Sequence, residues 1–124
     1  MYLLDTNTVI DFCNAKLPDK AKELLQKTIP VISVITRIEL FASAKISSQE
    51  LLTLERFVEI ATVHDTINLA IINHTIHIRQ QYRTALPDAI IAATALVYDL
   101  VLISRNISDF KNIQGLQVID PYKL

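Results

Sequence analysis

The chain has 124 residues, of which 51% are hydrophobic and 20% charged, and its formal net charge is −1. This length predicts a single domain over residues 1–124, because two separate cores would each be too small to be stable. The composition excludes intrinsically disordered and collagen-like proteins. The only cysteine, Cys13, cannot form an internal disulfide and is expected to act as a small buried hydrophobic side chain. The only glycine, Gly115, excludes the glycine-rich phosphate loops of dinucleotide-binding and P-loop proteins.

Targeting and membrane segments are not expected. The first five residues lack the basic region of a signal peptide. The most apolar stretch, residues 89–101, contains Asp99 and is too short to span a bilayer. We therefore expect a cytoplasmic protein with no membrane association. The mean hydropathy of +0.32 is high for a small domain, which predicts that some apolar side chains lie at a partner interface.

Short apolar runs alternate with helical patterns along the chain. Strands are expected over residues 2–4, 30–34, 60–63, 101–103 and 117–119. Helices are expected over residues 6–12, from Pro18 onward, and over 37–44, 47–57, 65–82 and 89–98, with a turn or short helix at 106–110. The expected helix-capping residues are Thr6 and Asn7, Thr36, Ser47 in a capping box with Glu50, and Asp65.

Strands separated by helices of this length predict an α/β fold with three layers. Its centre would be a mainly parallel sheet of four to five strands, covered by helices on both faces. The helix over residues 89–98 is apolar almost all round, so we expect it to be central and buried.

Four acidic residues adjoin runs that are expected to be core. Asp5 ends the first strand, Glu39 interrupts an apolar helix, Asp88 opens the most apolar helix, and Asp109 follows the fourth strand. Ligands of open parallel sheets bind at the carboxyl ends of the strands, so these carboxylates are expected to share one crevice. Oxygen ligands without His or Cys suit Mg²⁺ or Mn²⁺, which can hold a phosphodiester and activate water. The opposing interpretation makes Asp88 and Asp109 helix caps, leaves Glu39 exposed and pairs Asp5 with an amine.

Four segments together resemble the PIN domain family, and more narrowly its VapC-type toxins of type II toxin–antitoxin pairs. The segments are LLDTN at 3–7, TRIEL at 36–40, LPDAIIAATA at 86–95 and SRNISDF at 104–110. The resemblance implies a PIN-like fold and a metal-dependent endoribonuclease that leaves 5′-phosphate and 3′-hydroxyl ends. It also implies a homodimer held inactive by a cognate antitoxin. Many relatives carry a lysine shortly before Pro87, where this chain has Thr84, so backbone contacts to RNA are expected to differ.

The resemblance also assigns roles to individual residues. It implies that Asp5, Glu39, Asp88 and Asp109 are the catalytic metal ligands. Supporting polar groups are implied at Thr6, Asn7, Ser104 and Asn106.

Basic residues near the acidic motifs are candidates for binding RNA. Four of the thirteen acidic residues are the proposed ligands, so the rest of the chain is net positive. Arg37 and Arg105 each lie within four residues of a proposed ligand and are expected to contact RNA phosphates. His74 and His77 have a spacing that could place both imidazoles on one helix face. Zinc needs a third ligand that is missing nearby, so we expect surface or interface histidines.

Other functions remain possible from the sequence. The strongest is a haloacid-dehalogenase-like phosphatase with Asp5 as nucleophile, but it needs a second acid where Asn7 stands. A receiver domain would need paired acids after the first strand and a lysine after the last strands, and both are missing. A catalytically silent PIN fold that acts only as a binding module is the third alternative. RNA cleavage that is lost on EDTA treatment, without turnover of small phosphate esters, separates these possibilities.

Overall fold

The computed structural model describes residues 1–124 and contains one five-stranded sheet with the order β3-β2-β1-β4-β5, in which every neighbouring pair is parallel. This confirms the predicted α/β fold with a parallel sheet. The strands are β1 (Tyr2–Leu4), β2 (Val31–Ser33), β3 (Thr62–His64), β4 (Val101–Ile103) and β5 (Val118–Ile119).

Seven α-helices and a short 3₁₀ helix connect or follow the strands. They are α1 (Thr6–Cys13), α2 (Asp19–Gln26), α3 (Val34–Phe41), α4 (Ser48–Ile60), α5 (Leu69–Gln81), α6 (Leu86–Val97), α7 (Ile107–Phe110) and η1 (Pro121–Lys123). None of these helices has the length and apolar character needed to cross a membrane.

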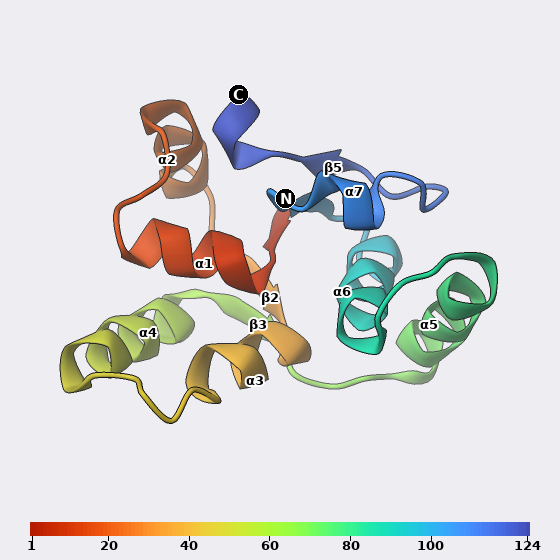
Figure 1. Ribbon diagram of the computed structural model, residues 1–124, viewed down its shortest axis with the longest axis horizontal. Helices are drawn as coiled ribbons and strands as arrows, with labels where there is room; N and C mark the ends of the chain where they lie inside the picture. Colours follow the sequence, from red (N-terminus) through yellow and green to blue (C-terminus); the bar gives the residue numbers. More distant parts are fainter.

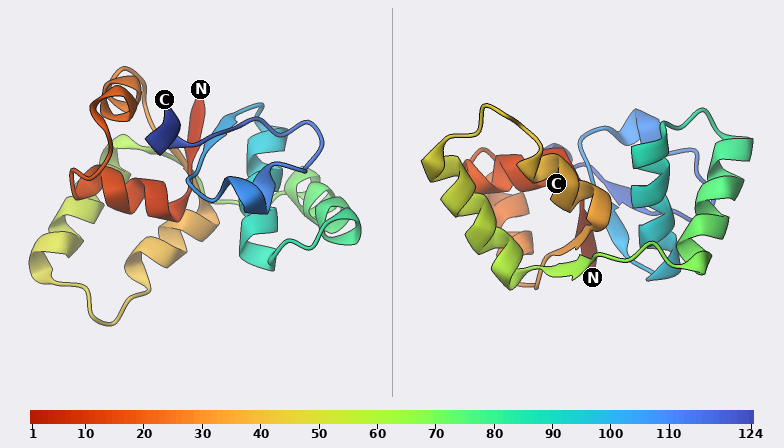
Figure 2. Two further views of the ribbon diagram at one scale, coloured as in Figure 1. Left: turned by 45° about the horizontal axis from the view of Figure 1, so that its top comes forward. Right: turned by 90° about the horizontal axis from the view of Figure 1, so that it is seen from below.

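The sheet separates two hydrophobic cores. Successive strand residues point to opposite faces, so Leu3 packs in one core and Leu4 in the other, as do Leu102 and Ile103. Helices α1, α2 and α4 lie on one side of the sheet and α5 and α6 on the other (Figures 1 and 2). The arrangement is the predicted three-layer α/β/α sandwich.

Helix α6 is the most buried helix, as predicted. Seven consecutive residues, from Ala89 to Ala95, are buried, and α6 packs closely against α5. Four of these seven residues are alanine, whose small side chain lets the neighbouring backbone approach. The helix starts at Leu86 rather than Ala89, because Pro87 fits the first turn of a helix, where its missing N–H donor is not needed.

Several predicted helix caps were wrong, although α1 starts at Thr6 as expected. Asp5 caps α1 in place of Thr6 and Asn7, and Ser33 caps α3 in place of Thr36, whose own N–H donates to Ser33 Oγ over 3.2 Å. Helix α3 therefore begins directly after β2. The cap of α5 is Asn68, which accepts from Ile71 N over 2.9 Å, so the helix starts four residues after the predicted cap at Asp65.

Other local predictions had mixed outcomes. Ser47 caps α4 as predicted and accepts from Glu50 N over 3.1 Å. Helix α4 extends to Ile60, so β3 starts at Thr62, later than expected. Cys13 is only partly buried, and burial raises the pKa of its thiol.

Candidate functional site

Asp5 is the most firmly held of the four predicted carboxylates. It directly follows β1, is buried, and caps α1 by accepting a hydrogen bond on Oδ1 from Thr8 N over 3.0 Å. The hydroxyl of Ser104, at the end of β4, donates to Asp5 Oδ2. The Asp5 backbone N–H also donates to Ile103 O over 3.2 Å. Two neighbouring strands and one helix start therefore fix this carboxylate at the carboxyl edge of the sheet.

Glu39 reaches the same edge from the second turn of α3. Its carboxylate is exposed and accepts a hydrogen bond on Oε1 from the hydroxyl of Thr6, over 2.6 Å. Thr6 Oγ1 also lies 3.3 Å from Oγ1 of Thr36, whose side chain is fully buried. The start of α1 is thus linked by side chains to α3, and this link orients the Glu39 carboxylate.

Asp88 is not a helix cap. The N-cap of α6 is Ala85, and Asp88 stands three residues later in the first turn. The pKa of Asp88 is raised above its ordinary value, first by burial and then by the negative charges of Asp109, Glu39 and Asp5, in that order. The raised pKa agrees with the prediction that these four acids gather in one place.

A pocket of about 170 Å³ lies between the acids. Asp5, Glu39 and Asp88 line it, together with the predicted supporting residues Thr6, Asn7 and Asn106 and the apolar Ile91. Asp109 is exposed on α7 and does not line the pocket, although its charge acts on Asp88. Three distant parts of the chain therefore bring three of the four predicted carboxylates to one cavity, and a fourth part contributes Asn106.

The donor set of this pocket fits a hard divalent cation. Its charged lining groups are all carboxylates, with hydroxyl and amide oxygens beside them, and neither His nor Cys takes part. The carboxylates stand around the pocket without forming a compact ligand shell, and no three acidic, His or Cys side chains elsewhere form one. The acidic side chains of this pocket that could hold a cation are Asp5, Glu39 and Asp88.

A second, larger pocket of about 450 Å³ adjoins the acid pocket, because Glu39 lines both. Residues of α1, α3 and α4 surround it, including Ile10, Leu40 and Leu54. Its lining is mixed apolar and polar.

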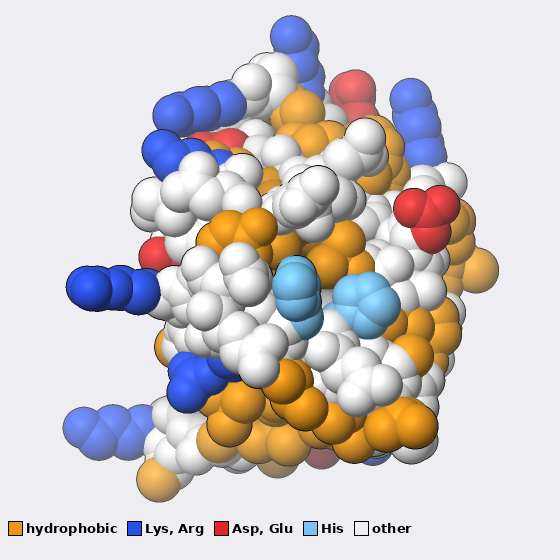
Figure 3. Space-filling view, turned by 90° about the vertical axis from the view of Figure 1, so that its right-hand side faces the viewer, with side chains coloured by type: hydrophobic (Ala, Val, Ile, Leu, Met, Phe, Trp, Pro, Cys, Tyr) orange, Lys and Arg blue, Asp and Glu red, His pale blue; other side chains and the backbone are white.

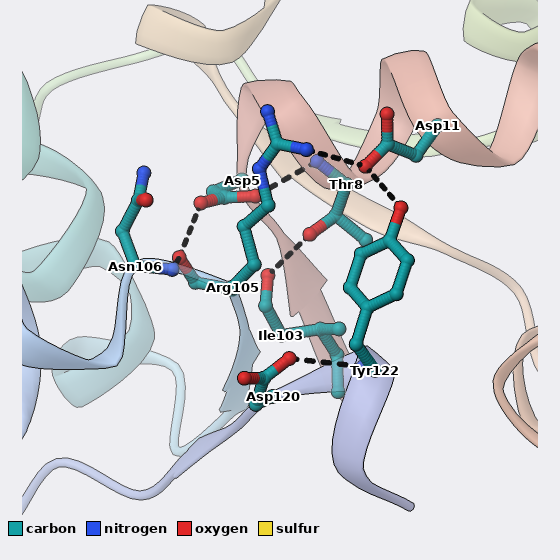
Figure 4. Close-up of polar contacts among 9 residues, drawn as sticks. Asp5, Thr8, Asp11, Ile103, Arg105, Asn106, Asp120 and Tyr122 are labelled. Carbon is teal, nitrogen blue, oxygen red and sulfur yellow. Dashed lines mark hydrogen bonds and ion pairs between the residues drawn. The ribbon is translucent and has the colours of Figure 1, made fainter. Parts of the chain in front are cut away.

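Figure 4 shows a polar network behind Asp5 that the sequence analysis missed. Asp11 of α1 is buried and forms an ion pair with Arg105, at 3.2 Å. The Tyr122 hydroxyl donates to the same Asp11 oxygen over 2.7 Å. An acid within an apolar helix was the signal that singled out Glu39, and the same signal is present at Asp11.

The two predicted RNA-binding arginines lie in different settings. Arg105 adjoins the acid pocket through its neighbours Ser104 and Asn106, but its guanidinium is paired with Asp11. Arg37 is exposed and lines a separate hollow with Glu55 and Glu59, away from the acid pocket. Contact of either residue with RNA stays a prediction.

His74 and His77 are exposed on α5, on the opposite side of the sheet from α1. Both line a pocket of about 190 Å³ with Tyr82 and Gln114, and His74 Nδ1 lies 3.0 Å from Ala70 O. Figure 3 shows two histidine side chains in the middle of this face.

Comparison with known proteins identifies the family. The PIN domain family model matches residues 2–116. No curated protein sequence matches the chain. A solved toxin–antitoxin complex from Klebsiella pneumoniae contains a chain that is 35% identical, with a TM-score of 0.79 and both chains fully covered.

Two further solved structures agree with this match. DNA-bound VapBC from Salmonella typhimurium is 29% identical with a TM-score of 0.82, and VapBC-1 from nontypeable Haemophilus influenzae is 30% identical with a TM-score of 0.77. In each case 96% of both chains is covered. The chain therefore belongs to the PIN domain family and is of the VapC type.

Proposed function

We propose that this chain is a metal-dependent endoribonuclease that acts as the toxin of a cytoplasmic toxin–antitoxin pair. Family membership and the likeness to VapBC complexes support the broader part of the proposal, a nuclease-type toxin. The observation that carries the finer part is the acid pocket, where Asp5, Glu39 and Asp88 meet from three separate elements. Because the chain belongs to the PIN domain family, it is neither a haloacid-dehalogenase-like phosphatase nor a receiver domain.

The contacts of each residue suggest its role in the proposed reaction. Asp5, Glu39 and Asp88 would hold Mg²⁺ or Mn²⁺, with Asp109 acting beside them. When bound, the ion would neutralise phosphate charge and lower the pKa of a water molecule. Ser104 and the α1 N-terminus hold Asp5, and Thr6 holds Glu39, so two carboxylates are oriented before the ion arrives. Asn106 lines the pocket, where its amide could contact the phosphodiester.

The decisive experiment is an RNA cleavage assay with purified protein. We expect hydrolysis of single-stranded or looped RNA with Mg²⁺ or Mn²⁺, loss of activity with EDTA, and recovery when the ion is restored. The protein should not hydrolyse small phosphate esters under the same conditions. An intact, folded protein that cleaves no RNA with either ion would favour the silent binding module.

The proposed antitoxin would occupy the larger pocket beside the acid site. The pocket is big enough for several side chains, and the shared residue Glu39 makes it continuous with the acid pocket. A basic side chain from the antitoxin could then reach the carboxylates and compete with the metal. Co-expression with the cognate antitoxin should yield a complex that cleaves no RNA. Ile10→Arg, at an exposed position of the pocket wall, should release active toxin.

The proposed homodimer would use the outer face of α5. Leu69, Ile72 and Ile76 lie at helical spacing on this helix and are 69%, 41% and 51% exposed. Figure 3 shows hydrophobic side chains gathered along the lower edge of the α5 side of the molecule. An apolar stripe of this kind is costly to expose to water, which favours a second copy as its cover. Light scattering at micromolar concentration should give twice the chain mass.

A further inference from the structure

Asp11 is a buried acid that the proposed chemistry does not use. It is 6% exposed and is one of three buried residues on α1, with Thr8 and Val9. It stands in the last turn of the helix, where the negative end of the helix dipole disfavours a carboxylate. Burying a carboxylate here is costly, and a leucine would suit both the helix and the core better. Stability therefore does not account for an acid at this position.

The partners of Asp11 come from far along the chain. Arg105 follows β4, and Tyr122 belongs to η1, beyond the residues that the family model matches. Both donate to the same oxygen, Asp11 Oδ2 (Figure 4). The pKa of Tyr122 is raised, mainly by this hydrogen bond to Asp11. Asp120 orients η1 by accepting from Tyr122 N over 2.9 Å.

The loop that Arg105 belongs to carries much of the proposed site. Ser104 holds Asp5 and accepts from Asn106 N over 3.0 Å, and α7 with Asp109 follows at once. Arg105, Asn106 and Asp109 are all exposed, between the buried residues Ser104 and Phe110. The end of β4 is already held, because Ile103 O accepts from Thr8 Oγ1 over 3.0 Å and from Asp5 N over 3.2 Å. Beyond Ser104, the ion pair of Arg105 with Asp11 is the side-chain link from the loop to α1.

We infer that Asp11 is a positioning residue: through Arg105, and with Tyr122 fixing its carboxylate, it anchors the β4–α7 loop to α1 and so holds Ser104 against Asp5. The inference rests on the proposed function, because the quantity that Asp11 would influence is the affinity of Asp5 and its neighbours for the metal ion. It also gives Arg105 a structural partner that competes with the RNA phosphates it was predicted to grip.

The test compares Asp11→Leu and Tyr122→Phe with the parent protein. Arg105 is 47% exposed and Tyr122 is 41% exposed, so both can turn to water when Asp11 is removed, and the melting temperature should stay the same or rise. In both variants the affinity for Mn²⁺, measured by electron paramagnetic resonance without RNA, should be lower than in the parent protein. We expect a loss of about three- to ten-fold, smaller than the 10–100-fold typical of a group that hydrogen-bonds a ligand directly.

Two further measurements separate positioning from other roles. Hydrogen exchange at the amides of Asn106 and Asp109 should speed up in Asp11→Leu, while the amides of α6 stay unchanged. The Mg²⁺ concentration for half-maximal RNA cleavage should rise in step with the Mn²⁺ dissociation constant. Tyr98→Phe is the matched control, because it removes a hydroxyl that accepts from Asn68 Nδ2 far from the site, and it should change neither quantity.

The outcomes are distinct. Unchanged Mn²⁺ affinity and unchanged exchange in Asp11→Leu, in a parent that binds Mn²⁺ and cleaves RNA, would overturn the inference and leave the proposed function intact. A lower melting temperature with unchanged Mn²⁺ affinity would show that the cluster only stabilises the fold, which also overturns it. A parent that neither binds Mn²⁺ nor cleaves RNA would refute the proposed function, and the inference with it.

Discussion

Replacing Asp88 with asparagine should stabilise the metal-free protein. The substitution keeps the shape of the side chain and removes one negative charge from a site that also holds Asp5, Glu39 and Asp109. These three charges and partial burial disfavour the ionised form of Asp88, which is why its pKa is raised. Asparagine at this position avoids that repulsion at neutral pH.

The size of the effect follows from two opposing contributions. A close pair of like charges costs between about 1 kcal/mol in water and about 4 kcal/mol at an effective dielectric constant near 20. Asp88 is only partly buried, so solvent screening keeps the total relief near the low end, about 1–2 kcal/mol. Loss of a negative charge in the first turn of α6 costs roughly 0.3–1 kcal/mol through the helix dipole. The net gain of about 1 kcal/mol corresponds to a rise in melting temperature of about 3–5 °C for a chain of this size.

Calorimetry in EDTA and in millimolar Mg²⁺ would measure this gain. The difference between variant and parent should shrink with Mg²⁺, because the parent gains stability from binding the ion. Asp19→Asn is the matched control: it is the same change in the first turn of α2, outside the acid pocket, and should slightly lower the melting temperature. If Asp88→Asn behaves like Asp19→Asn and neither responds to Mg²⁺, the four acids do not share a site and the nuclease proposal loses its main support.

The pH dependence has a definite sign. Because the folded-state pKa of Asp88 lies above its ordinary value of 3.8, folding binds a proton in the interval between the two, and stability falls as pH rises through it. The penalty is complete above the folded-state pKa and vanishes below the ordinary value. The melting temperatures of parent and Asp88→Asn should therefore converge in acid and separate as pH approaches neutrality.

Three further predictions address other parts of the molecule. Asp5→Asn should abolish RNA cleavage while circular dichroism stays native, because asparagine still caps α1 but no longer supplies a charged ligand; undiminished cleavage would remove Asp5 from the mechanism. Gly115→Ala should lower the free energy of unfolding by about 1 kcal/mol in urea titration, since the backbone φ of +84° disfavours a side chain although space is available; an unchanged midpoint would contradict this. Ile76→Asp should convert the proposed dimer to a monomer in light scattering, while Ile60→Asp, also exposed but outside α5, should not; equal masses for both variants would place the interface elsewhere.

The sequence by itself determined the layers of this fold. Short apolar runs separated by helical stretches predict parallel strands covered on both faces, and the alternation of Leu3 and Leu4 between two cores is a local consequence of strand geometry. The sequence also indicated the acidic residues of the site, because burying a carboxylate beside core residues costs free energy unless it is paired or binds a metal. The capping serine of α4 was predictable because a capping box is encoded within four consecutive residues.

Tertiary structure decided what depends on distant residues or on competition between near ones. More than one residue near the start of α3 and of α5 can cap a helix. In the folded chain the caps are Ser33 and Asn68, and not the predicted Thr36 and Asp65. The link from Asp11 to Tyr122 joins residues 111 positions apart, so no local pattern could reveal it. Arg37 is close to Glu39 in sequence yet turns to a different hollow, because neighbouring helix residues point in different directions. Which side chains face the acid pocket is therefore set by how the helices dock on the sheet, and this information is present only in the folded chain.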